Sequence, residues 1–286
     1  MSARVRVLSA EKYLSLIAAK TPLVTLDCSW YPAGKDGHAE YKAEHIRGAR
    51  YFDFNELKTE SPYPHMLPRD FPEFAAAAGR LGVRRSDHIV VYDHATYLSA
   101  PRVAWLLATF GHPNVFLLDN YRAYKQLGGE VASGESPAVE PTQYLPAGEP
   151  APSVAPWLEF DDVLSLVESE APVNIIDARG AERFSGAQPE PRPGVQSGHI
   201  PGSKKIPFSS VVDEHGHFKT GDELRALLAA QHVDPSKRTV ILCGSGVTAV
   251  VVKTALDESL GTNAEIYDGS WAEWGQRAPA KFVVKG

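Results

Sequence analysis

The chain has 286 residues, of which 43% are hydrophobic and 22% are charged, and its formal net charge at pH 7 is −6. This length is near that of two domains, and the composition is that of an ordinary globular protein. The acidic excess argues against nucleic-acid binding, and no apolar stretch is long enough to cross a bilayer, so we expect neither nucleic acid nor membrane as a partner.

The N-terminus and the cysteines predict a cytoplasmic protein. The first residues reach Glu11 and Lys12 without the apolar core of a signal peptide. The two cysteines, Cys28 and Cys243, argue against a disulfide framework and suit a reducing compartment. Cysteine and histidine do not recur at metal-site spacing, so we expect no metal.

Short strands alternate with helices along the chain. Apolar runs predict strands over Ile89–Tyr92 and Thr239–Leu242, and Ala100–Phe110 predicts a helix that stops at Gly111. Residues 129–156 are rich in Pro, Gly, Ser and Glu without an apolar period, which predicts a surface linker. Further helices are predicted from the spacing of Phe160, Val163, Leu164 and Val167, and from the capping box Thr220–Glu223. Strands that are apolar on both faces indicate an α/β fold with mainly parallel sheets flanked by helices.

The chain also repeats itself once. The matching positions are Asp27 with Asp177, His45 with His199, Asp93 with Cys243, and Asp119 with Asp268, at offsets of 150, 154, 150 and 149 residues. Four matches in order at nearly constant spacing indicate two copies of one domain. Since His45 and His199 recur in both halves and the cysteine does not, we expect a structural role for both histidines.

Cys243 is the strongest candidate for a reactive residue. It follows the strand Thr239–Leu242 and precedes the short loop Gly244–Thr248, so it should lie at the ligand edge of the sheet. Loop amides and the next helix N-terminus should lower the pKa of the thiol and populate the thiolate. Gly244 and Gly246 permit backbone angles that other residues resist.

Two arginines of the second half could support this cysteine. Arg183 and Arg192 belong to a loop that follows a strand, and two guanidinium groups could clamp a small carboxylate. For any single arginine, a solvated charge is the commoner interpretation. Asp177 and Arg179 are expected to hold the strand end and the loop in place.

Together these motifs resemble the sulfurtransferases of the rhodanese family. The resemblance covers nearly the whole chain and depends on three segments: Ser61–Pro68, Gln188–Arg192 and Cys243–Thr248. It implies two tandem rhodanese-like domains, of which residues 1–128 are catalytically silent because Asp93 replaces the cysteine. Residues 129–156 are then the linker, and residues 157–286 are the catalytic domain.

The resemblance also implies roles for individual residues. Cys243 is the nucleophile and sulfur carrier, and Ser245 and His65 are further catalytic residues. The donor is bound by Arg183 and Arg192 together with the loop residues Gly244, Gly246, Val247 and Thr248. Where relatives often have an acid behind the histidine, this sequence has Asn55 next to Glu56, and no acid is assigned.

The implied reaction moves sulfane sulfur through a Cys243 persulfide to a thiol such as thioredoxin, or to cyanide, without metal or organic cofactor. Gly244 and Ser245 stand where thiosulfate-preferring members carry cations, so the resemblance is closest to the branch whose donor is 3-mercaptopyruvate, which leaves as pyruvate. Thiosulfate as donor and a non-catalytic persulfide carrier remain alternatives. A cysteine phosphatase is a poor one, because the arginine expected six residues after the cysteine is Ala249.

Overall fold

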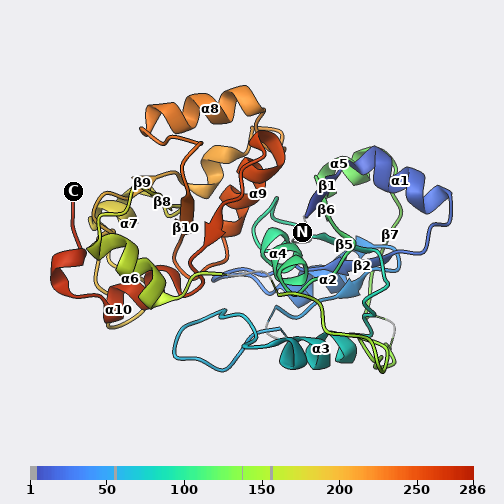
Figure 1. The fold of residues 1–286 in the computed structure, drawn as a ribbon. Helices are drawn as coiled ribbons and strands as arrows, with labels where there is room; N and C mark the ends of the chain where they lie inside the picture. Colours follow the sequence, from blue (N-terminus) through green and yellow to red (C-terminus); the bar gives the residue numbers. More distant parts are fainter. Residues whose placement is uncertain (1–4, 55–56, 137, 155–156) are drawn as a thin grey trace. The chain divides into compact units, whose positions relative to one another are not determined.

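The computed structural model describes residues 5–54, 57–136, 138–154 and 157–286. The chain divides into two compact units (Figure 1). Unit 1 comprises Met1–Thr59 and Leu67–Ala155, and unit 2 comprises Glu60–Met66 and Pro156–Gly286. Within the described residues, no helix is both long enough and apolar enough to span a membrane.

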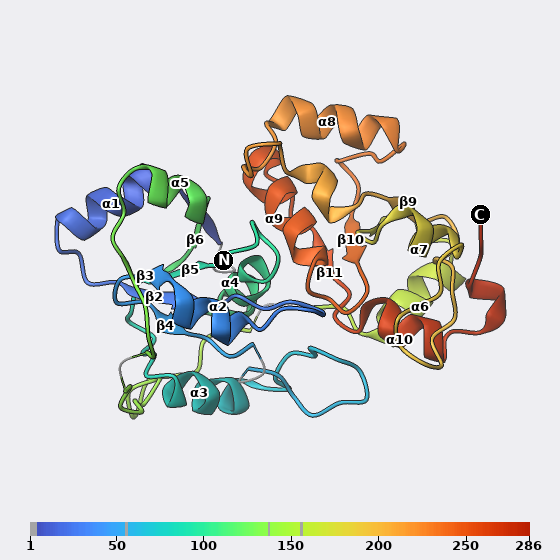
Figure 2. The ribbon, with the colours of Figure 1, turned by 180° about the vertical axis from the view of Figure 1, so that it is seen from behind.

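Unit 1 is built on a parallel sheet of five strands in the order β1-β6-β5-β2-β4. Its strands are β1 (Arg6–Leu8), β2 (Val24–Asp27), β4 (Arg50–Tyr51), β5 (Ile89–Tyr92) and β6 (Val115–Leu118). Its helices are α1 (Ala10–Ala18), α2 (Gly37–Ala43), α3 (Phe71–Arg80), α4 (Ala100–Thr109) and α5 (Tyr121–Gln126). Helices α1 and α5 lie side by side on one side of this sheet, and α3 lies on the other (Figures 1 and 2).

Unit 2 repeats this plan with a parallel sheet in the order β11-β10-β8-β9. Its strands are β8 (Asn174–Asp177), β9 (Lys204–Lys205), β10 (Thr239–Leu242) and β11 (Glu265–Ile266). Its helices are α6 (Phe160–Glu168), α7 (Ala181–Ser185), α8 (Gly221–Ala230), α9 (Ala249–Leu260) and α10 (Ser270–Arg277), with short 3-10 turns at Phe208–Val211 and Ala280–Phe282. Helices α8 and α9 pack together on one side of the sheet, and α6 and α10 lie on the other (Figure 2). The predicted α/β fold with mainly parallel sheets is confirmed.

Local sequence signals explain where several elements begin and end. The capping box before α8 is present, since the N–H of Thr220 donates to Oε2 of Glu223 at 2.9 Å. Helix α4 ends before Gly111, whose φ of +77° suits glycine. Strands β5 and β10 are buried along their whole length. Burial on both faces is what their unbroken apolar sequences predict.

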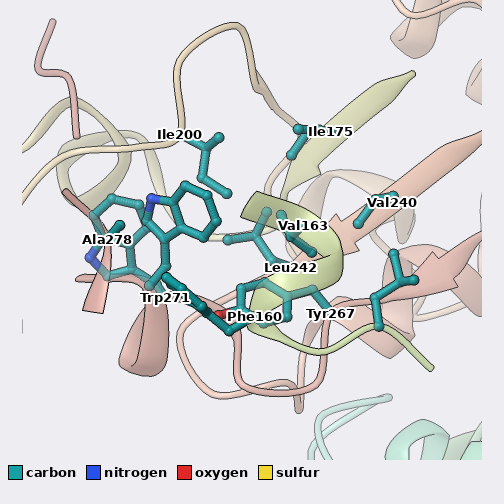
Figure 3. Packing of buried hydrophobic residues seen from close by; sticks show 11 residues of the cluster. Phe160, Val163, Ile175, Ile200, Val240, Leu242, Tyr267, Trp271 and Ala278 are labelled. Carbon is teal, nitrogen blue, oxygen red and sulfur yellow. The ribbon is translucent and has the colours of Figure 1, made fainter. Parts of the chain in front are cut away.

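The core of unit 2 lies between α6, α10 and the sheet (Figure 3). Trp271 and Trp274 of α10 are both fully buried, and the Trp274 ring lies 5.4 Å from that of Phe160. The Trp271 indole N–H donates to the carbonyl of Gln196 at 2.8 Å, so the ring also fixes the loop after α7. Burial of two tryptophans anchors α10 firmly, and the first turn of α10 abuts the loop after β10.

Much of the segment 129–156, which the sequence predicts to be a linker, packs on unit 1. Strand β7 (Val131–Ala132) pairs antiparallel with β3 (His45–Ile46). Tyr144 is 2% exposed, and its ring meets that of Phe74 edge-on at 5.1 Å. Its hydroxyl lies 2.9 Å from Nδ1 of His112. This segment therefore contributes to the core of unit 1.

Candidate active site

Cys243 lies directly after the central strand of unit 2, at the carboxyl end of β10. It lies between Leu242, the last residue of β10, and the loop that leads to α9, and it is 2% exposed. Its backbone N–H donates to Oγ of Ser270 at 3.2 Å, and its carbonyl accepts from the N–H of Trp271 at 3.0 Å. The first residues of α10 thus bind both the N–H and the carbonyl of Cys243. The cysteine has the strand-end position that the sequence predicts.

The two glycines of the cysteine loop are required for different reasons. Gly246 has φ of +78°, in the left-handed region that favours glycine, as predicted. The φ of Gly244 lies outside that region, so the prediction that it supplies an unusual backbone angle is wrong. A Cβ on Gly244 would lie 2.9 Å from Nη2 and 3.2 Å from Nη1 of Arg183. A side chain at position 244 would therefore require the Arg183 guanidinium to shift, and its hydrogen bonds to Glu190 oppose that shift.

The rest of the loop is buried and leads into α9. Ser245 is 9% exposed and Val247 is 2% exposed. Thr248 is the N-cap residue of α9, but its side chain accepts no capping hydrogen bond. The positive end of the helix dipole is therefore directed toward the loop without a competing Thr248 hydroxyl.

Arg183 is held by a network of charged side chains. Nε and Nη2 of Arg183 both donate to Glu190, at 3.2 and 2.5 Å. Nη1 of Arg179 donates to the same carboxylate at 2.8 Å, and its Nε and Nη2 bind Asp177. The Arg179 guanidinium also lies 4.2 Å from the centre of the Trp271 ring. The predicted positioning roles of Asp177 and Arg179 agree with these contacts.

Arg192 completes the positive charge of the site. Burial and the charge of Arg183 lower the pKa of Arg192, while the charges of Glu190 and Cys243 oppose this shift. The charges of Arg183 and Cys243 therefore both act on the Arg192 guanidinium. Among the described residues, Arg192 donates no side-chain hydrogen bond, in contrast to Arg183. Its guanidinium donors are therefore not engaged by the described part of the protein.

In unit 1 the position that matches Cys243 is occupied by a buried carboxylate. Asp93 follows β5 and accepts hydrogen bonds from the N–H groups of Ala95, Ser99 and Ala100, at 3.0, 2.9 and 2.8 Å. Burial raises its pKa, and these hydrogen bonds oppose the shift. The Asp93 carboxylate thus takes amides that the equivalent loop of unit 2 could offer to a ligand.

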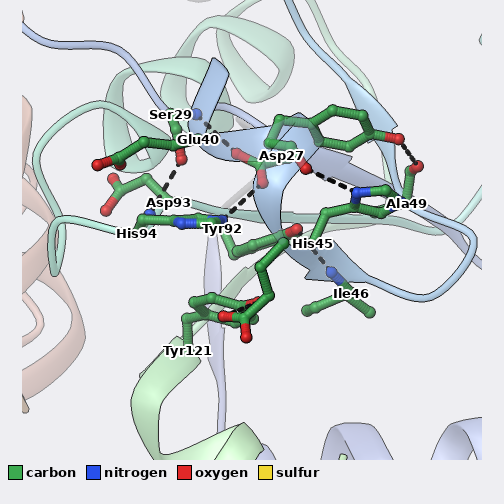
Figure 4. A network of polar contacts seen from close by, with 12 residues as sticks. Asp27, Ser29, Glu40, His45, Ile46, Ala49, Tyr92, Asp93, His94 and Tyr121 are labelled. Atoms are coloured by element: carbon green, nitrogen blue, oxygen red, sulfur yellow. Dashed lines mark hydrogen bonds and ion pairs between the residues drawn. The ribbon is translucent and has the colours of Figure 1, made fainter. Parts of the chain in front are cut away.

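A polar network surrounds Asp93 at the same edge of the sheet (Figure 4). Nε2 of His94 lies 3.0 Å from Oδ2 of Asp27, which is fully buried. The His94 backbone N–H donates to Oγ of Ser29, and its ring stacks on Tyr121 at 4.6 Å. In unit 1, polar and aromatic side chains of the unit itself therefore occupy the sheet edge that is equivalent to the cysteine edge of unit 2.

His45 and His199 have matching structural roles. Nδ1 of His45 lies 2.8 Å from the carbonyl of Tyr41, and its ring stacks on Tyr41 with centroids 3.9 Å apart. Nδ1 of His199 lies 2.9 Å from the carbonyl of Phe184, and its ring stacks on Phe184 at 3.9 Å. Each histidine thus makes the same two contacts with an aromatic residue of a helix, Tyr41 of α2 or Phe184 of α7, in agreement with the role expected from the repeat.

The remaining candidates differ in what the structure says of them. His65 has φ of +62° and belongs to the segment Glu60–Met66 that groups with unit 2. Asn55 and Glu56 lie outside the described residues. Cys28 is fully buried, and this burial raises the pKa of its thiol well above the usual value, which agrees with a structural role. In the described part of the chain, no group of three or more His, Cys, Asp or Glu could hold a metal ion.

Sequence reasoning missed three residues that shape the site. Glu190 binds both Arg183 and Arg179, and Ser270 and Trp271 fix the Cys243 peptide. Glu190 lies two residues before Arg192, in a motif that the sequence singles out for its arginine alone. The proximity of this acid to Arg192 in sequence was the signal that could have identified Glu190. No local sequence pattern links α10 to the cysteine loop.

Comparisons with known proteins place this geometry among relatives. Residues 9–121 and 159–277 each match the family described as Rhodanese-like domain. The chain is 44% identical to the 3-mercaptopyruvate sulfurtransferase of Escherichia coli (strain K12) over 84% of this chain and 83% of the relative. It is 37% identical to the thiosulfate sulfurtransferase of Rattus norvegicus over 92% and 88%. The crystal structure of Tum1 from Saccharomyces cerevisiae superposes with a TM-score of 0.89 at 31% identity, covering 98% of each chain.

Proposed function

The chain belongs to the rhodanese family, and from this premise we propose that it is a 3-mercaptopyruvate sulfurtransferase that works through a Cys243 persulfide. The acceptor is a thiol, for example that of thioredoxin, or cyanide, and the compartment is the cytoplasm. Residues 157–286 form the catalytic domain. Residues 1–128 form a silent domain, and residues 129–156 connect the two.

The reaction has two half-reactions with covalent catalysis. The Cys243 thiolate attacks the sulfur of 3-mercaptopyruvate, and the carbon–sulfur bond breaks. Its electron pair passes into the ketone, so the leaving group is the enolate of pyruvate. The proton of the donor thiol is transferred to this enolate, which leaves pyruvate and an anionic cysteine persulfide. The acceptor nucleophile then attacks the outer sulfur and restores the thiolate.

One observation carries the proposal: a buried strand-end cysteine with two guanidinium groups beside its loop. The Arg183 guanidinium lies against Gly244, and the charge of Cys243 influences the pKa of Arg192. Two cations near one thiolate suit a small anionic donor, because guanidinium groups bind carboxylates with two hydrogen bonds. The loop amides of Gly244, Ser245 and Gly246 are suited to stabilise the persulfide anion.

The remaining roles follow from the family resemblance. Arg183 and Arg192 bind the carboxylate and the ketone of the donor. Ser245 and His65 assist the proton transfer. Val247 and Thr248 form the part of the loop that leads into α9. Asp93 keeps the first domain silent because a carboxylate cannot carry sulfane sulfur.

Thiosulfate is the alternative donor, and a relative named for it is 37% identical to this chain. What favours mercaptopyruvate is the absence of a side-chain cation at Gly244 and Ser245, next to the cysteine. A phosphatase is disfavoured because Ala249 stands where a phosphate-clamping arginine is expected. A pure persulfide carrier would not need two arginines beside the cysteine.

The test compares steady-state rates with mercaptopyruvate and thiosulfate, using the same acceptor. We expect a higher specificity constant for mercaptopyruvate and release of pyruvate in step with sulfur transfer. Without acceptor, donor treatment should add one sulfur to the Cys243 peptide, as read by mass spectrometry, and Cys243→Ser should abolish both results. Equal or better turnover of thiosulfate, or a label on Cys28, would overturn the proposal.

A further inference from the structure

We propose that Glu190 is a positioning residue that orients Arg183 and limits the net charge of the donor site, so that the site selects a monoanionic donor. The inference rests on the proposed sulfurtransferase function and deepens it. Glu190 lies between the two arginines in sequence, and its side chain is 4% exposed. Its carboxylate is the common partner of Arg179 and Arg183.

The contacts of Glu190 decide which edge of Arg183 is open. Glu190 accepts hydrogen bonds from Nε and Nη2 of Arg183, so it occupies the edge of the guanidinium group that these two nitrogens form. Nη1 and Nη2 face Gly244 of the cysteine loop, since they are the atoms nearest to its Cβ position. Nη1 makes no hydrogen bond to Glu190, so it can donate to an oxygen of the donor. Glu190 therefore holds the Arg183 guanidinium against the cysteine loop.

Glu190 is itself held in place from the scaffold side. Arg179 binds Glu190 with Nη1, binds Asp177 with Nε and Nη2, and lies over the ring of Trp271. The backbone of Trp271 in turn binds the carbonyl of Cys243. The sulfur carrier and the donor-binding arginine are thus tied to one another through a closed chain of contacts.

The same network sets the charge that a donor meets. Three guanidinium groups and two carboxylates contribute to the charge of the site, and their sum is one positive charge. The groups belong to Arg179, Arg183, Arg192, Asp177 and Glu190. With the thiolate, the site is neutral before the donor arrives. A mercaptopyruvate carboxylate then adds one negative charge, whereas thiosulfate adds two. Since charges interact strongly in a buried site, the dianion is disfavoured.

The loop itself cannot supply a compensating cation at position 244. A side chain there would crowd Arg183, whose Nη2 would lie 2.9 Å from the new Cβ. The charge of this site is therefore adjusted most directly through Glu190. With glutamine at position 190, the total charge of the site with thiosulfate bound would equal that of the native site with mercaptopyruvate bound.

The experiment measures kcat and KM for both donors, with one acceptor, in Glu190→Gln, Glu190→Asp and Glu182→Gln. Glu182 is an exposed acid next to Arg183 on α7, so its variant has the same change in net charge. In Glu190→Gln we expect the preference for mercaptopyruvate over thiosulfate to fall about tenfold or more. We expect Glu182→Gln to keep the native preference. Glu190→Asp keeps the negative charge, but its shorter side chain moves the carboxylate away from Arg183. This variant should therefore keep the preference while the less well oriented Arg183 lowers kcat for mercaptopyruvate.

The outcomes separate this inference from the proposed function. Equal losses for both donors in Glu190→Gln, with the preference unchanged, would overturn the inference and leave Glu190 as part of the scaffold. A similar change of preference in Glu182→Gln would also overturn it, because general electrostatics would then suffice. If Glu190→Gln does not fold, loss of the preference in Glu190→Asp would count against the charge argument. Failure of the native protein to use mercaptopyruvate would instead overturn the proposed function.

Discussion

Arg183 and Gly244 constrain one another in this site. The guanidinium comes from α7 and occupies the space that a side chain at position 244 would need. The cation near the cysteine therefore comes from another element, and the loop after β10 can stay short and neutral. A glycine that looks like a backbone requirement in the sequence is required here by the approach of a distant arginine.

This pairing predicts a strong effect of a single methyl group. In Gly244→Ala the new Cβ would lie 2.9 Å from Nη2 of Arg183, so the guanidinium must move away from the loop. Loss of one charge-assisted hydrogen bond to the donor costs about 1.5–3 kcal/mol, which lowers kcat/KM roughly tenfold to a hundredfold. Steady-state kinetics with mercaptopyruvate would measure this change.

A double-mutant cycle shows whether the effect passes through Arg183. In an Arg183→Ala background, the added methyl has no guanidinium to displace, so Gly244→Ala should cost little further activity. If the two substitutions instead act additively, the alanine disturbs the loop by another route and the steric argument is wrong.

At the scale of elements, the segment after unit 1's last helix is tied to the core through His112. His112 is fully buried, its Nδ1 lies 2.9 Å from the Tyr144 hydroxyl, and its Nε2 lies 2.9 Å from the carbonyl of Asp87. Burial lowers the pKa of His112 to about 4. The imidazole is therefore neutral in the folded protein at neutral pH, where it donates once and accepts once.

The lowered pKa predicts a loss of stability in acid. An unfolded histidine titrates near pH 6.5. Between about pH 6.5 and 4, the unfolded chain therefore binds a proton at His112 that the folded chain does not bind. The contribution of neutral His112 is present above pH 6.5 and is lost as the pH falls to 4, by about 3 kcal/mol in total. Hydrogen exchange of the β5 amides at several pH values would measure it within unit 1.

His112→Gln is the matched control because glutamine can donate and accept but does not titrate in this range. We expect the variant to show a flatter dependence of β5 protection on pH between 6.5 and 4. Parallel curves for the native protein and the variant would assign the acid sensitivity to other groups.

For the whole molecule, the sequence predicts more of the fold than of the site. Strands β5 and β10 have the predicted bounds because unbroken apolar runs can only be buried on both faces. The internal repeat predicts where Asp93 and Cys243 lie, since both follow matching strands. Tyr144 stands in a segment without an apolar period, so no sequence pattern marks it as buried, and the contacts of Glu190 join residues that only the fold brings together.

The two units also show that the catalytic difference between them extends beyond one residue. In unit 2, Arg179 binds the buried Asp177 and neutralises its charge next to the cysteine loop. In unit 1, Ser29 stands at the position of Arg179, and the pKa of Asp93 is raised by burial first and by the charge of the equivalent acid Asp27 in addition. Unit 1 therefore offers a less favourable electrostatic environment for an anionic sulfur.

This asymmetry predicts that a cysteine alone will not activate unit 1. In the double variant Asp93→Cys with Cys243→Ser, the new thiol replaces a carboxylate whose pKa is raised by burial and by the charge of Asp27, so the thiolate should be disfavoured in the same way. We expect turnover of mercaptopyruvate to stay at the level of Cys243→Ser alone, at least a thousandfold below the native rate, which is the scale of losing a covalent nucleophile. Mass spectrometry after donor treatment should find no added sulfur on the peptide that contains residue 93. Recovered turnover together with a persulfide at residue 93 would show that the position after the central strand is sufficient, and that the arginine network of unit 2 is not required for sulfur transfer.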